Sequence, residues 1–237
     1  MSVIELSQRA QRIEPFYVME MAKHAQEVAR QSSASGAAPM IYLNIGEPDF
    51  SAPPLVQQAA ERAIRAGRTQ YTQAPGLPEL REKISAWYAS RFGVDVPARR
   101  IIITAGASAA LQLACLALIN PGDEVLMPDP SYPCNRHFVS AAEGKAVLIP
   151  SSAAERFQLS ADKVQAAWGE HTRGVMLASP SNPTGTSIAP DELRRIHEVV
   201  RAKGGLTIVD EIYLGLSYDE TFGKSALELG EDIISIN

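Results

Sequence analysis

The segment 104–110, Thr-Ala-Gly-Ala-Ser-Ala-Ala, combines small residues with one hydroxyl group where a helix is expected to begin. Small side chains let an anion approach the free backbone N–H groups of a helix start, and the helix dipole favours negative charge there. Gly106, Ala107 and Ser108 are therefore a candidate phosphate site. Close packing of a helix start selects the same small residues, so this segment alone leaves both interpretations open.

Two proline-rich segments offer a flat ring and an amide group. Residues 128–133, Pro-Asp-Pro-Ser-Tyr-Pro, form a stiff loop in which Tyr132 can present its ring to an aromatic ligand. Residues 179–185, Ser-Pro-Ser-Asn-Pro-Thr-Gly, restrict the backbone more than an ordinary turn needs, and Asn182 can donate to an oxygen that must be held in place. Purely structural turns, the first with a half-buried tyrosine, are the alternatives.

A carboxylate and a second tyrosine follow another apolar segment. Asp210 comes directly after residues 207–209, where a carboxylate is costly unless a cation or a hydrogen-bond donor compensates its charge. No basic residue stands next to it, so a ligand cation such as a pyridinium nitrogen is a suitable partner, and Tyr213 can donate to a phenolic oxygen on the same ring. An aspartate that caps the following turn is the alternative.

Together these four segments offer a phosphate cradle, an aromatic face, an oxygen donor and a carboxylate for a ring nitrogen. This set matches the functional groups of pyridoxal 5′-phosphate, and no nucleotide needs it. The sequence therefore predicts a pyridoxal-phosphate site, and we predict no metal site.

Alternating strands and helices must bring these segments together. Short apolar runs predict strands at residues 101–104, 124–127, 146–149, 174–178, 207–209 and 233–236, and helical patterns between them fall at 107–118, 134–142, 161–168 and 191–203. This order predicts an α/β fold with a mainly parallel sheet covered by helices on both faces. Ligands of such sheets bind beyond the carboxyl ends of the strands, where all four candidate segments lie.

The N-terminal part of the chain has a different pattern. A helix is expected at residues 16–30, and a small, polar and flexible linker at residues 31–38. We therefore predict an N-terminal arm and linker over residues 1–38 and a large ligand-binding domain over residues 39–237.

Composition limits the classes of function. The chain has 237 residues, 46% of them hydrophobic and 21% charged, which is ordinary for a soluble globular protein. A net charge of −5 gives no reason to expect nucleic acid as a partner, and no apolar run reaches the length of a membrane span. The two cysteines cannot form a disulfide framework, and Cys115 is expected in the core. We expect a cytoplasmic protein without a secretion signal.

The sequence resembles the class I/II aminotransferases, which belong to the fold-type I pyridoxal-phosphate enzymes. The resemblance covers nearly the whole chain from about residue 15, and Asn-Pro-Thr-Gly followed by Asp-Glu-Ile-Tyr is highly specific for it. The matching segments, in the family's order and spacing, are residues 44–50 (Asn-Ile-Gly-Glu-Pro-Asp-Phe), 71–81, 181–185 and 209–213.

The resemblance implies a role for each candidate residue. Asp210 pairs with the pyridine nitrogen, Asn182 and Tyr213 hold the phenolic oxygen, and Tyr132 stacks on the ring. Gly106, Ala107 and Ser108 bind the phosphate. Gly46 lies against the substrate carboxylate, and Tyr71 reaches the phosphate of a partner subunit's cofactor in a homodimer. The implied reaction moves an amino group between an amino acid and a 2-oxo acid.

The chain departs from the family pattern at its end. Family members carry Ser-x-Ser-Lys or a similar segment after a strand like 233–237, and none of the six lysines here stands at that place. The resemblance therefore implies a chain that stops before the catalytic lysine and the C-terminal small domain. We expect such a chain to be inactive by itself, with the isoleucines of residues 233–236 poorly covered.

Two alternatives to amino transfer remain. The first keeps the cofactor and changes the reaction to that of a β-lyase, a decarboxylase or a synthase. The second is a non-catalytic pyridoxal-phosphate-binding regulatory module, which would need a basic helix-turn-helix before residue 40. The N-terminal arm has only one expected helix and few charges, which disfavours this second alternative.

Overall fold

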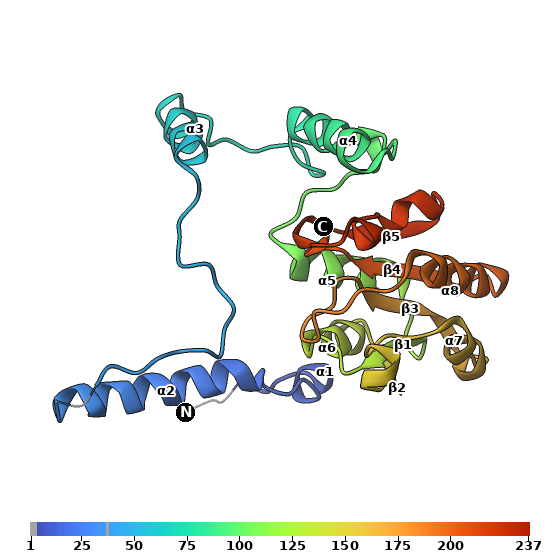
Figure 1. Ribbon diagram of the computed structural model, residues 1–237, viewed down its shortest axis with the longest axis horizontal. Helices are drawn as coiled ribbons and strands as arrows, with labels where there is room; N and C mark the ends of the chain where they lie inside the picture. The colour runs from blue at the N-terminus through green and yellow to red at the C-terminus, as the bar shows by residue number, and fades with distance from the viewer. Residues whose placement is uncertain (1–3, 37) are drawn as a thin grey trace. The chain divides into compact units, whose positions relative to one another are not determined.

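The computed structural model describes residues 4–36 and 38–237, which form two compact units (Figure 1). One unit joins the residues up to Ile13 to Pro75–Asn237, and the other is Glu14–Ala74. This division follows contacts and does not test the predicted arm and linker over residues 1–38, which stay a prediction.

A five-stranded sheet forms the centre of the larger unit. Its strands are β1 (Glu124–Asp129), β2 (Lys145–Pro150), β3 (Thr172–Ala178), β4 (Leu206–Asp210) and β5 (Ile233–Ile236). Their order is β2-β1-β3-β4-β5, and every neighbouring pair is parallel. All five strands therefore end at the same edge of the sheet, which we call the carboxyl edge.

Helices cover both faces of this sheet, as the sequence predicts, and Figure 1 shows one pair on each side. The helices α5 (Ala107–Leu118) and α6 (Cys134–Ala141) pack on one face, and α7 (Ala161–Ala167) and α8 (Pro190–Ala202) on the other. Alternation along β4 separates the two cores, because Ile208 belongs to the core with α5 and α6 and Val209 to the core with α7 and α8. We call these the α5/α6 face and the α7/α8 face.

A fifth helix of this unit, α4 (Pro78–Phe92), has clear end signals. Pro78 occupies the first turn, where no backbone donor is needed, and Gly93 closes the helix with a φ of 71°. Tyr88 is buried on this helix, and its hydroxyl accepts a hydrogen bond from Asn237 Nδ2 at 3.0 Å. The unit is completed by the short helix α1 (Gln8–Gln11) and by 3₁₀ turns η1 (Ala98–Arg100), η2 (Ala153–Glu155), η3 (Leu214–Leu216), η4 (Glu220–Phe222) and η5 (Ala226–Leu229).

The smaller unit contains α2 (Tyr17–Ala34) and α3 (Pro54–Arg65). None of its described residues is buried, so this segment has no core of its own. In the part of the chain that the structure describes, no helix combines the length and the apolar character that crossing a membrane requires.

Most predicted elements are confirmed, and three expectations are wrong. Residues 101–104 form no strand, although three isoleucines in succession favour one. The helix expected over 16–30 continues to Ala34, so the start of the expected linker is helical. Ile233 and Ile236 are buried rather than poorly covered, because β5 pairs with β4 and contributes to both cores. Cys115 is buried as expected.

Candidate functional site

The carboxyl edge of the sheet brings two of the candidate loops together. Ala178, the last residue of β3, pairs with Asp210, the last residue of β4. The backbone N–H of Ser179 then donates to the carbonyl oxygen of Asp210 at 3.0 Å. The loop that carries Asn182 therefore begins beside the predicted carboxylate.

Asp210 lies on the α5/α6 face, because it is two residues after Ile208 along β4. Its side chain is largely buried, and Oδ1 accepts a hydrogen bond from the backbone N–H of Ile212 at 3.1 Å. Burial raises the pKa of this carboxyl group, and the Ile212 bond lowers it by a smaller amount. Among the described residues, no basic side chain forms an ion pair with Asp210.

Tyr132 and Tyr213 lie within electrostatic reach of each other and of Asp210. Burial raises the pKa of the Tyr132 phenol to about 12, with further contributions from a hydrogen bond to Cys134 and from the charges of Tyr213 and Asp210. Tyr132 is half-buried, and Tyr213 remains 37% exposed. The structure thus brings together residues from the second and fourth candidate segments.

The loop of Asn182 is held by its own hydrogen bonds. Ser181 N–H donates to the Thr186 carbonyl at 2.9 Å, and Gly185 N–H donates to the Ser181 carbonyl at 2.7 Å. Gln158 Nε2 also donates to the Thr186 carbonyl, at 2.9 Å. Asn182 is half-buried, and its amide has no hydrogen-bond partner within the described part of the chain. A fixed loop therefore carries an unused donor.

The start of α5 points toward the carboxyl edge. Arg173 Nε, at the beginning of β3, donates to the carbonyl of Leu118, the last residue of α5, at 3.2 Å. This bond places the end of α5 at the amino edge of the sheet. Twelve helical residues and six strand residues both span about 18–20 Å, so α5 begins near the opposite edge.

That helix start has the features of an anion site. Gly106 precedes it with a φ of 86°, which favours glycine, and no side chain caps the free N–H groups of the first turn. Ala107 is half-buried and Ser108 is exposed. The geometry leaves backbone donors, the helix dipole and one hydroxyl group available to a phosphate.

Gly46 and Tyr71 belong to the smaller unit. Both are exposed, and no atom lies within 4 Å of the position that a Cβ on Gly46 would occupy. Their predicted roles, toward a substrate carboxylate and toward a partner's phosphate, stay predictions.

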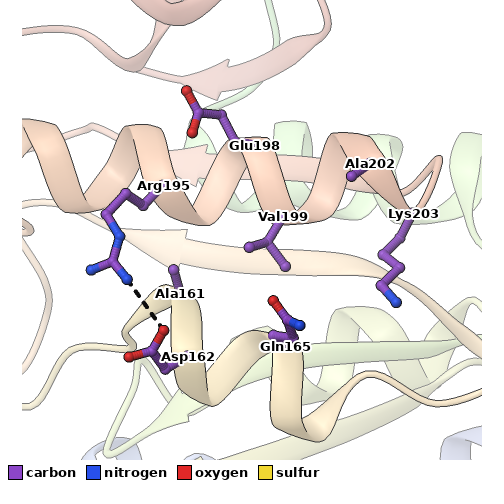
Figure 2. A pocket seen from close by; sticks show the side chains of 8 residues that line it. All are labelled: Ala161, Asp162, Gln165, Arg195, Glu198, Val199, Ala202 and Lys203. Carbon is purple, nitrogen blue, oxygen red and sulfur yellow. Dashed lines mark hydrogen bonds and ion pairs between the residues drawn. The ribbon is translucent and has the colours of Figure 1, made fainter.

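A cavity between α7 and α8 contains none of the candidate site residues (Figure 2). It has a volume of about 420 Å³ and is lined by Ala161, Asp162, Gln165, Arg195, Glu198, Val199, Ala202 and Lys203. The guanidinium of Arg195 already pairs with Asp162 at 3.2 Å and with Glu192 at 2.8 Å. The cavity is therefore lined by a surface ion pair and by none of the candidate residues of the carboxyl edge.

Glu211 is an important residue to which the sequence assigned no role. It is 1% exposed, and both of its carboxylate oxygens accept hydrogen bonds. The sequence signal was its place after a buried strand end, next to Asp210. Its partners, Ser225 and Ser235, stand far along the chain, so their convergence was not predictable from local pattern.

Comparison with known proteins identifies the family. The family described as aminotransferase class I and II matches residues 38–234. The chain belongs to this family. A putative aminotransferase, YugH, of Bacillus subtilis is 39% identical over 79% of the chain and 49% of that protein. The valine–pyruvate aminotransferase of Mycobacterium tuberculosis is 39% identical over 87% of the chain and 52% of that protein.

Solved structures agree with this aminotransferase assignment. An aminotransferase from Mycobacterium tuberculosis superposes with a TM-score of 0.89 and 36% identity, over 98% of this chain and 59% of that one. The aspartate aminotransferase of Thermus thermophilus with maleate gives a TM-score of 0.90 at 29% identity, over 98% and 60%. The fold is thus the pyridoxal-phosphate fold type I. The chain spans about half the length of the curated relatives it matches.

The residues at the carboxyl edge fit the cofactor of this family. Pyridoxal phosphate has a ring nitrogen that accepts a proton, a phenolic oxygen and a phosphate. Asp210 is a buried carboxylate with one hydrogen bond, Asn182 holds an unused amide, and α5 begins without a cap. These three groups of the cofactor each have a chemically suitable partner on this chain.

Proposed function

We propose that the protein carrying this chain transfers amino groups between an amino acid and a 2-oxo acid, with pyridoxal phosphate as its cofactor. The observation that supports this most strongly is Asp210, which is buried on the same sheet face that α5 covers and has no basic partner among the described residues. Family membership supports the same reaction class.

Pyridoxal phosphate, when bound, supplies an electron sink for the bond electrons at the substrate's α-carbon. Asp210 holds a proton at the ring nitrogen, because its buried negative charge stabilises the pyridinium form. Asn182 and Tyr213 donate to the phenolic oxygen. Gly106, Ala107 and Ser108 bind the phosphate through backbone N–H groups and a hydroxyl, which orients the ring. Tyr132 stacks on the ring and excludes water from one face.

The proposal extends to substrate and assembly. Gly46 leaves room for the substrate carboxylate, and Tyr71 reaches the phosphate of a second copy in a homodimer. Curated relatives carry names with different substrates, namely valine with pyruvate and aspartate. We therefore propose the class of substrate, amino acid and 2-oxo acid, and no single pair. The cytoplasmic location stays a prediction of the sequence.

The whole gene product that carries this chain provides the test. We expect that, incubated with pyridoxal phosphate, an amino acid and 2-oxoglutarate or pyruvate, it forms one new amino acid for each 2-oxo acid that it releases. An Asp210→Asn variant should lose most of this turnover, whereas a Glu228→Gln variant, changed at an exposed carboxylate, should keep it. Release of ammonia without a new amino acid would instead indicate a lyase.

A further inference from the structure

Glu211 connects three separate segments of the larger unit through its carboxylate. Oε2 accepts hydrogen bonds from Ser225 Oγ at 2.9 Å and from Ser235 Oγ at 2.5 Å. Oε1 accepts from the backbone N–H of Ala226 at 2.6 Å. The end of β4, the start of η5 and the strand β5 are therefore held at one buried point.

The backbone of Glu211 reinforces this connection. Its N–H donates to the carbonyl of Ile236, the last residue of β5, at 2.7 Å. Asp210 pairs with Ile236 in the same ladder. The residues on both sides of the Asp210–Glu211 peptide bond are thus fixed to β5.

The two adjacent carboxylates point to opposite faces of the sheet. Glu211 alternates with Asp210 along the chain. Its partner Ser235 lies between Ile234 and Ile236, which both belong to the α5/α6 core, and shares the opposite face of β5 with Ile233 of the α7/α8 core. The side chain of Glu211 therefore lies on the α7/α8 face, and Asp210 lies on the α5/α6 face with the start of α5. An anchor on one face sets the direction of the side chain on the other.

The environment of Glu211 suits an anchor rather than a reacting group. It is almost completely buried, and both oxygens are used by hydroxyl and backbone donors. No ion pair to it is found among the described residues. Three donors on one buried carboxylate fix its position more strictly than a surface ion pair would.

We propose that Glu211 is the positioning residue of the cofactor site, which directs the Asp210 carboxylate toward the ring nitrogen by fixing the end of β4 to η5 and β5. This inference deepens the proposed function and rests on it for the identity of the ring. Glu211 itself touches neither cofactor nor substrate.

A measurement without cofactor tests the positioning directly. The three-bond couplings of the Asp210 side chain report its χ1 rotamer by NMR in the chain studied without pyridoxal phosphate. We expect one rotamer in the wild type and in Glu228→Gln, the same chemical change at an exposed carboxylate of η5. We expect averaged Asp210 rotamers in Glu211→Gln. Ser235→Ala removes only one of the donors to Glu211, so we expect a smaller degree of averaging in this variant. Ser235→Ala also replaces Glu211→Gln as the test if that variant fails to fold. An unchanged Asp210 rotamer in folded variants overturns the proposal.

Two ligands distinguish a positioning role of Glu211 from a general structural role. Pyridoxal phosphate and its 1-deaza analogue, which has carbon in place of the ring nitrogen, are titrated by fluorescence into the whole gene product that carries this chain. We expect Glu211→Gln to weaken pyridoxal phosphate about tenfold and the analogue by less than about twofold, as Asp210→Asn does. Equal weakening of both ligands would show a merely structural role. If the wild type binds neither ligand, the proposed cofactor fails, and the rotamer measurement still decides the role of Glu211.

Discussion

At the scale of single residues, Asp210 combines burial with little compensation. Its carboxylate accepts one hydrogen bond, from Ile212 N–H, and burial raises its pKa above the ordinary value of 3.8. A carboxyl group whose pKa is higher in the folded than in the unfolded state makes its full contribution to the stability of the fold when the pH is below its unfolded-state pKa. This contribution is lost as the pH rises through the folded pKa.

We predict that Asp210→Asn, which mimics the neutral acid, gains stability over the wild type as the pH rises from about 4 to about 7. Urea unfolding of both chains without cofactor, at several pH values in this range, measures the difference in free energy of unfolding. The control is Asp219→Asn, at an exposed residue whose pKa is lowered rather than raised by its bonds to Thr221. A constant difference between Asp210→Asn and the wild type across the range contradicts the prediction.

Tyr132 gives a second prediction at this scale. If its ring stacks on the cofactor, the face of the ring matters and the hydroxyl does not. Tyr132→Phe should then change the dissociation constant of pyridoxal phosphate by less than about twofold, and Tyr132→Leu should raise it by about two- to tenfold. Fluorescence titration of the three chains measures this. Equal loss in both variants would assign the contribution to the hydroxyl group.

At the scale of elements, the sheet depends on close approach between β3 and β4. Gly174 pairs with Leu206, and a Cβ at Gly174 would overlap the Leu206 carbonyl oxygen. Because backbone cannot move aside as a flexible side chain does, Gly174→Ala should destabilise the chain by about 1–3 kcal/mol. The midpoint of thermal unfolding should fall by about 2–4 °C for each kcal/mol.

The matched control is Gly215→Ala, since Gly215 also has an ordinary backbone conformation and no atom lies within 4 Å of its Cβ position. This variant should unfold at nearly the wild-type temperature. A similar loss in both variants would mean that the β3–β4 contact is not the cause.

Elements were predictable from sequence where pattern and tertiary packing agree. Helix α5 and strand β5 have the predicted bounds, because a long apolar run and a short β-branched run each pack on the sheet. Residues 101–104 have the same β-branched character, but their backbone finds no strand to pair with, and Ile103 N–H instead donates to the Pro75 carbonyl. Helix α4 was not predicted, although Pro78 and Gly93 mark its ends.

The candidate site was predictable in part for the same reason. Asp210 ends β4 and Asn182 lies in the loop that follows β3, so a parallel sheet must bring them to one edge. The anchor at Glu211 was not predictable, because its partners Ser225 and Ser235 are 14 and 24 residues away and become neighbours only through the fold.

At the scale of the whole molecule, the smaller unit has many exposed apolar side chains. None of its described residues is buried, and Ile41, Leu43, Phe50 and Leu55 are mostly exposed. Exposed apolar side chains that gather into a patch mark interaction sites in soluble proteins. The proposed homodimer gives this surface an occupant, a second copy of the chain, and gives Tyr71 a neighbour's phosphate to contact.

We predict that the smaller unit is protected by self-association. Limited proteolysis should cut within residues 41–53 first, because all of these residues are exposed, and the cutting rate should fall as the protein concentration rises. Phe50→Ser should abolish this dependence and shift the sedimentation coefficient to that of a monomer. Leu216→Ser, at a similarly exposed apolar residue of the larger unit, should change neither the concentration dependence nor the sedimentation coefficient.

Tyr71→Phe removes only the oxygen proposed to reach the partner's phosphate, so it should preserve the dimer and weaken the binding of pyridoxal phosphate. A monomer at every concentration, cut at a constant rate, would refute the shared site, because Tyr71 would then have no second copy to serve.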